Sequence, residues 1–325
     1  MAALLGAAFL VMTGCAPVPE LGEATAEDTY ALGVEAAEAG DYLLAIESFR
    51  RITIGAPDHE TADDALIALA DAHRAMSDYA SAQESYRLLL SDYGDSPLAP
   101  AARHRLCLTR FDIGVEAARH GNYTLAIESF RDITLETPLH EIADDALVAL
   151  ADAHRAIADY ASAEEEYRAL LLDYPHSPLV PEAEYKLGMT FFDQMLPVGL
   201  DQSMTEQAIS QFEYFVAAFP SSEFADEAAG KILELRTRLA AKRYDSAVLY
   251  FTLRKPKAAR VYLEAVIVEY PDTIWARVAL LDKARSFAAE GARALAEGEY
   301  QRLMELYPGT EEARTAAAEV AAMQG

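Results

Sequence analysis

The sequence predicts an all-α solenoid of about six to seven helix–turn–helix units. Residues 33–106 recur as residues 114–187, 81 positions later, without a gap and with roughly two-thirds of positions identical. Small and aromatic residues also return at fixed, helical offsets inside each copy, and the chain shows no sustained period-two alternation or hairpin signal. A stacked array of this kind presents a binding surface rather than one catalytic pocket.

Each copy begins with a predicted pair of antiparallel helices. In the first copy the pair has Gly33, then Ala45 twelve positions later and Phe49 four positions further on. Gly114 and Phe130 hold the same places in the second copy. The small residues allow close approach of two helices, and the aromatic ring fills the seam between them.

The second half of each copy has the same arrangement with different residues. It holds Leu66, Leu69, Ala70, His73, Tyr79, Ala82, Tyr86 and Leu89, and their counterparts 81 positions later. These offsets resemble the tetratricopeptide repeat, a helix–turn–helix unit of about 34 residues.

Weaker copies of the pattern continue to the C-terminus, as expected for repeats that cap a stack. A fifth unit fits if its turn carries about eight extra residues, near MLPVGLDQ, and a long helix is predicted over residues 223–251. A sixth and a seventh unit follow. The predicted organisation is a signal peptide (1–14), a linker (15–28), a first repeat pair (29–107), a second pair (108–182) and C-terminal units with a tail (183–325).

The N-terminus reads as a lipoprotein signal. The apolar run MAALLGAAFLVMTGC is too short to span a bilayer, which takes about 20 helical residues. Met12-Thr13-Gly14-Cys15 looks like a bacterial lipobox, which implies acylation of Cys15, and Ala16 after it favours the outer membrane. No Lys or Arg precedes the run, so either the true start lies upstream or Cys15 is an ordinary cysteine.

The charge of the chain is strongly acidic, with one basic exception. A net charge of −26 argues against binding to nucleic acid, whose phosphates demand Lys and Arg, and against contact with anionic lipid head groups. Residues 231–260 are locally basic. This block is either a docking face for an acidic partner or a solvated face balanced by neighbouring acids.

Signals for catalysis are weak. The chain has no HExxH, GxSxG, P-loop or Cys-x-x-Cys motif, and no cofactor or metal is predicted. His73 and His154 recur with a nearby acid, yet they occupy a packing position of the repeat, so structural imidazoles are expected. Cys107 is expected to be a buried, inert thiol.

The repeat resemblance also implies a peptide groove. In tetratricopeptide proteins two positions of each first helix face the concave side, and here they are polar in the second half of each copy and apolar elsewhere. The predicted groove residues are Asp71, Arg74, Asp152, Arg155, Met189 and Phe192. The alternative is that Asp71 with Arg74, and Asp152 with Arg155, form ion pairs within one helix.

Together the lipobox, the repeat ends YPHSP, FPSSEF and YPDT, and the run from Leu235 to Thr273 resemble the BamD-like family of outer-membrane assembly lipoproteins. The resemblance covers about residues 110–310 and implies a non-enzymatic periplasmic adapter on the outer membrane. Its implied partners are a BamA-like barrel assembly protein and unfolded outer-membrane proteins, with Arg254 and Arg260 as candidate docking residues. Alternatives are a scaffold of the Tol-Pal and cell-wall system and, less favoured, an enzyme acting on wall glycans.

Overall fold

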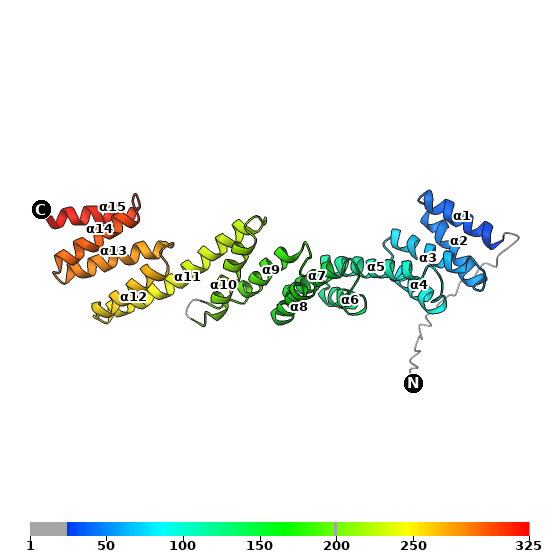
Figure 1. Cartoon of the computed structure of the whole chain (residues 1–325), viewed down its shortest axis with the longest axis horizontal. Helices are drawn as coiled ribbons and strands as arrows, with labels where there is room; N and C mark the ends of the chain where they lie inside the picture. The colour runs from blue at the N-terminus through cyan, green and yellow to red at the C-terminus, as the bar shows by residue number, and fades with distance from the viewer. Residues whose placement is uncertain (1–24, 198–199, 325) are drawn as a thin grey trace, which may run out of the picture. The chain divides into compact units, whose positions relative to one another are not determined.

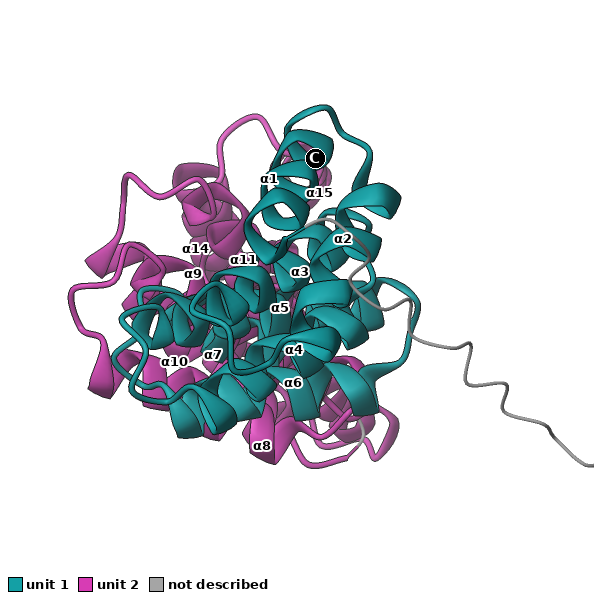
Figure 2. Cartoon of the chain, turned by 90° about the vertical axis from the view of Figure 1, so that its right-hand side faces the viewer, with its two compact units in different colours: residues 1–153 teal, residues 154–325 magenta. Residues whose placement is uncertain are grey.

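The computed structural model describes residues 25–197 and 200–324, and every regular element in these ranges is an α-helix (Figure 1). The chain divides into two compact units, Met1–Ala153 and His154–Gly325, with the boundary inside the seventh helix (Figure 2).

The first seven helices begin in unit 1. They are α1 (Ala26–Glu38), α2 (Tyr42–Gly55), α3 (Ala62–Ala75), α4 (Tyr79–Asp92), α5 (Ala99–Arg119), α6 (Tyr123–Glu136) and α7 (Ala143–Ala156). The remaining helices belong to unit 2. They are α8 (Tyr160–Asp173), α9 (Val180–Asp193), α10 (Ser203–Ala218), α11 (Ala225–Thr252), α12 (Pro256–Glu269), α13 (Ile274–Ala289), α14 (Arg293–Leu306) and α15 (Glu311–Gln324).

The predicted all-α array of helix–turn–helix units is confirmed, but the predicted number of units is too low. In chain order the fifteen helices of the described residues make seven successive pairs and leave α15 over. The extra helix lies at the C-terminal end, where the repeat offsets in the sequence fade because a terminal repeat has no following neighbour to pack against.

Close contact between a glycine and a phenylalanine defines three of the helix pairs. A Cβ added at Gly33, Gly114 or Gly188 would lie 2.6, 2.5 and 2.6 Å, respectively, from the Cε1 of Phe49, Phe130 and Phe212. No side chain fits at such distances, so the ring takes the space that glycine leaves. The predicted role of small residues facing an aromatic in the helix seam is confirmed.

Short turns between the helices of a pair need one residue with positive φ. Glycine supplies it at Gly40, Gly121 and Gly291, whereas Ser77, Ala158 and Arg254 adopt φ of 59°, 60° and 54°. The residue directly after it often caps the second helix with its side chain: Asp41, Asp78, Asn122 and Asp159 each accept a hydrogen bond from a backbone N–H three residues later. The α9–α10 turn is longer, from residue 194 to 202, as the sequence predicts.

Two helices are longer than the 13 to 16 residues of most others. α11 has 28 residues, which matches the predicted long helix. α5 has 21 residues, because the end of the first sequence copy runs without a break into the start of the second. No described helix has both the length and the apolarity needed to cross a membrane.

Candidate protein-interaction site

The predicted groove residues of α3 are bonded to the neighbouring helix α5. Arg74 donates from Nε and Nη2 to the same carboxylate oxygen of Asp112, at 2.9 and 2.7 Å. Asp71 accepts from Arg105 and, at 2.5 Å, from the hydroxyl of the buried Tyr86. The ion pairs therefore join two helices, and the expectation of an Asp71–Arg74 pair within α3 is wrong.

A similar contact joins the C-terminal end of α7 to the C-terminal end of α9. The Nε of Arg155 lies 2.6 Å from the Oδ2 of Asp193, and both side chains are about three-quarters buried. Asp152 also has an interaction partner. The four charged residues of the predicted groove are thus engaged inside the protein, and a ligand would have to compete with these contacts.

The two apolar groove residues lie on α9. Both Met189 and Phe192 are partly exposed, and the ammonium of Lys231 lies 4.1 Å from the centre of the Phe192 ring. This cation–π contact joins α9 to α11. Met189 and Phe192 are therefore accessible side chains on one helix, beside a cation.

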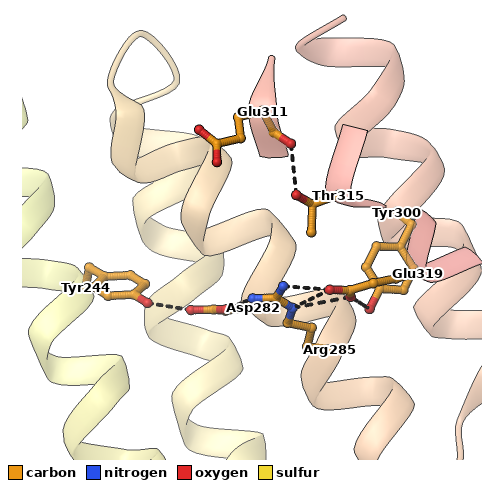
Figure 3. A network of polar contacts seen from close by, with 7 residues as sticks. All are labelled: Tyr244, Asp282, Arg285, Tyr300, Glu311, Thr315 and Glu319. Carbon is orange, nitrogen blue, oxygen red and sulfur yellow. Dashed lines mark hydrogen bonds and ion pairs between the residues drawn. The ribbon is translucent and has the colours of Figure 1, made fainter. Parts of the chain in front are cut away.

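Unit 2 contains a polar network that the sequence reasoning missed (Figure 3). Tyr244 of α11 donates to Asp282 of α13, and Arg285 of α13 binds Glu319 of α15 with Nη2 at 2.6 Å and Nε at 3.0 Å. The hydroxyl of Tyr300 donates to the other oxygen of Glu319 at 2.5 Å. The hydrogen bonds from Arg285 lower the pKa of Glu319, while burial raises the pKa of Tyr300.

The sequence does carry a signal for this network. An Asp followed three positions later by Arg occurs at Asp71 and Arg74, at Asp152 and Arg155, and again at Asp282 and Arg285. In each case the arginine bonds to the next first helix, at Asp112 of α5, Asp193 of α9 and Glu319 of α15. The third occurrence could have been found from the spacing alone.

The two predicted docking residues differ sharply in their surroundings. Arg260 donates to the Ser286 hydroxyl at 2.8 Å and to Glu290 at 3.0 Å, and its guanidinium lies 4.3 Å from the Phe287 ring centre. Only 11% of its side chain is exposed. Arg254 lies in the exposed turn between α11 and α12, and its side chain has no bonding partner among the described residues.

The two repeated histidines lie near the C-terminal ends of α3 and α7. The Nδ1 atoms of His73 and His154 lie 3.0 Å from a carboxylate oxygen of Asp78 and Asp159, respectively. Both imidazoles are buried, and each aspartate also caps the following helix. Cys107 is buried too, and burial raises the pKa of its thiol. Within the described ranges, no three His, Cys, Asp or Glu side chains are grouped to hold a metal ion.

A match to a known family starts where the first sequence copy ends. Residues 107–303 fit the model of a family described as outer membrane lipoprotein, YfiO. The chain belongs to this family. A tetratricopeptide repeat model matches residues 64–96, inside the first copy. The first copy thus precedes the YfiO region, while Cys15, the predicted lipidation site of this lipoprotein family member, lies outside the described residues.

Two curated relatives carry the same name. The chain is 27% identical over 163 residues to the outer membrane protein assembly factor BamD of Caulobacter vibrioides, covering 50% of this chain and 53% of that protein. It is 25% identical over 183 residues to BamD of Rickettsia prowazekii, covering 56% and 73%. The chain therefore spans about half the length of the first relative, and it is BamD-like in sequence.

The solved structures that match the chain are more distant in sequence. A tetratricopeptide repeat protein from Parabacteroides merdae is 15% identical, with a TM-score of 0.38, covering 92% of this YfiO family chain and 99% of that chain. The pilF protein of Pseudomonas aeruginosa is also 15% identical, with a TM-score of 0.32, covering 90% and 97%.

Proposed function

We propose that this protein is a non-enzymatic adapter of the machinery that assembles β-barrel proteins in the outer membrane. The observation that carries the proposal is the YfiO match over residues 107–303, together with two relatives named outer membrane protein assembly factor. A lipid on Cys15 would tether the chain to the periplasmic face of the outer membrane, as the lipoprotein family suggests.

The adapter has two tasks in this proposal. Its C-terminal helices dock on a BamA-like barrel assembly protein, and the helices that precede them, up to α9, receive unfolded outer-membrane proteins. Of the two arginines expected at the docking face, Arg254 is the one whose charge is available, because Arg260 is held by Ser286 and Glu290. For the substrate, partly exposed Met189 and Phe192 offer apolar contacts next to the paired charges of Arg155 and Asp193.

The test is co-purification from detergent-solubilised membranes. Full-length protein serves as bait, and a Cys15→Ala variant serves as control for the lipid tether. The proposal expects recovery of the barrel assembly protein with the wild type, and depletion of the bait should lower outer-membrane barrel proteins as a class. Recovery of cell-wall proteins in place of the barrel assembly protein would refute it.

A further inference from the structure

A cleft lies in unit 1 where the two sequence copies join, and we call it the joint cleft. Its volume is about 510 Å³, which is a usual size for a ligand site. Residues 77–87 of the α3–α4 turn and α4 form one wall, residues 125–132 of α6 form the other, and Arg110 and Ile113 of α5 lie between them. The α4 wall precedes residue 107, where the YfiO match begins, so the joint cleft depends on the first sequence copy.

The α6 wall lacks an ion pair that its counterpart in the first copy has. In α2, Glu47 pairs with Arg51 at 2.6 Å, one helical turn away. The equivalent residues of α6 are Glu128 and Asp132, two carboxylates that repel each other at the same spacing. Glu128 is exposed and has no bonding partner among the described residues. The negative charge of this wall is therefore available to a ligand.

The α4 wall lacks an ion pair in the same way. In α8, Arg168 pairs with Glu164 at 2.9 Å, but α4 has Gln83 at the place of this glutamate. The amide of Gln83 can turn its oxygen toward Arg87 without balancing the charge of the guanidinium. Within the described part of the chain, no ion pair joins Arg87 to the carboxylates of α6. The two walls thus carry opposite charges that do not neutralise each other.

A buried arginine lies between the walls. Only 6% of the Arg110 side chain is exposed, and its Nη1 donates to Glu136. Its Nε has no hydrogen-bond partner and lies 3.8 Å from the Oδ2 of Asp132. The positions 81 residues before and after hold Thr29 and Phe191, so the repeat itself does not require a cation here. A buried N–H without an acceptor is unfavourable, and a ligand oxygen in the joint cleft could supply that acceptor.

Apolar side chains complete the lining. Leu125 is 40% exposed, and Ile113 and Tyr79 are partly exposed. A ligand with one sign of charge would be repelled by one of the two walls, which disfavours nucleic acid and anionic head groups. A peptide can carry both signs around an apolar side chain. Local departures from the repeat that cost stability and gather at one cleft indicate a role outside the fold.

We infer that the joint cleft binds a peptide segment of a partner protein, with a basic and an acidic side chain on either side of an aliphatic one. The basic group pairs with Glu128 and Asp132, and the acidic group pairs with Arg87. The aliphatic group contacts Leu125, and a backbone carbonyl of the peptide accepts from the Nε of Arg110. This site goes beyond the proposed function, because it requires neither the barrel assembly protein nor an unfolded barrel protein as its ligand.

The test uses a double variant that keeps the net charge constant. Gln83→Glu gives Arg87 the ion pair that α8 has, and Glu128→Gln removes the free carboxylate of α6. Both changes favour the fold, so the melting temperature should be equal to that of the wild type or higher. The matched control makes the same two exchanges at exposed positions of α14, as Gln301→Glu with Glu305→Gln.

A library of random dodecapeptides displayed on phage is the probe. It is selected on immobilised full-length protein in detergent, after subtraction on the double variant. The inference expects enriched peptides that combine a basic, an aliphatic and an acidic residue. Measured by fluorescence anisotropy, these peptides should bind the wild type and the control alike and bind the double variant at least about tenfold more weakly.

Four results would overturn the inference. They are the absence of any enriched peptide, enriched peptides of one charge sign, equal affinity for the wild type and the double variant, and a melting temperature of the double variant below that of the wild type. The last result would show that Gln83 and Glu128 serve the fold. A parallel sedimentation of unlipidated Cys15→Ala protein uses phosphatidylethanolamine vesicles, whose head group also carries both signs. Vesicle binding that the double variant loses and the control keeps would assign the joint cleft to a lipid and refute the peptide site.

Discussion

The charged residues of the first helices and those at the turn between α11 and α12 differ in whether they are bonded within the protein. Asp71, Arg74 and Arg285 are bonded to neighbouring helices of the same chain, at separations of 34 to 38 residues. The side chains of Arg254, Lys255 and Lys257 are exposed and have no bonding partner among the described residues. The comparison teaches that basic composition alone does not locate a docking surface, because most of the basic block between residues 231 and 260 serves internal contacts.

The largest effect is expected where the internal network is cut. Glu319→Ala removes the acceptor of Arg285 and leaves the hydroxyl of the buried Tyr300 without its partner, so we expect a loss of about 2 kcal/mol in the free energy of unfolding. Urea unfolding followed by circular dichroism measures it, at equal m-values. Glu305→Ala, an exposed residue of the adjacent helix, should change stability little. Equal losses in both variants would contradict a structural role for the network.

The sequence predicts the helices and the packing within a helix pair, but not the polar contacts between one pair and the next. The Gly33–Phe49 and Gly114–Phe130 contacts were predictable because small and aromatic residues at fixed offsets fall within one helix pair. The partner of Arg74 was not, because Asp112 is brought near it by the continuous helix α5, whose length depends on how two sequence copies join. Arg254 and Arg260 looked alike in sequence, and only tertiary contacts distinguish them.

A second variant tests this distinction directly. Arg260→Ala should lower the free energy of unfolding by about 1.5 kcal/mol, because Ser286 and Glu290 lose a largely buried charged donor. Arg254→Gly should instead raise stability. Thermal melts of the two variants, side by side, check the opposite signs. Destabilisation by both would mean that Arg254 also has a structural contact.

The pair of His104 on α5 and His140 before α7 makes a smaller, pH-dependent contribution. The Nε2 of His140 lies 2.9 Å from the Nδ1 of His104, and the Nδ1 of His140 accepts from the Ile142 N–H at 3.3 Å. Two neutral imidazoles can make both of these contacts. Burial, and then the charge of His104, lower the pKa of His140, while Glu141 raises it. As the pH falls below about 6.5, residue 140 therefore takes up a proton in the unfolded chain before it does so in the folded chain. The free energy of unfolding decreases in this pH range.

His140→Gln should remove this drop, which solvent screening limits to a few tenths of a kcal/mol. Unfolding midpoints at pH 7.5 and 5.5 measure it. His176→Gln, at an exposed position of unit 2, is the matched control. If the midpoint of the wild type changes no more between the two pH values than the midpoint of the His140→Gln variant, the contribution is ruled out.

The smallest effect on stability is expected at Lys255 and Lys257, beside the turn between α11 and α12. Lys255→Gln with Lys257→Gln should leave the free energy of unfolding unchanged within about 0.5 kcal/mol, because neither side chain has a partner among the described residues. The same melts provide the measurement. A clear loss of stability would show that these lysines belong with the internally bonded charges.

The continuous helix α5 also explains how a duplicated segment could be accommodated without a linker. Residues 107–113 separate the two copies, and this seven-residue segment, about two helical turns long, lies wholly inside α5. Insertion of one residue there would rotate everything downstream by about 100° about the helix axis. The register of the joint, rather than its sequence, is what such a duplication has to preserve.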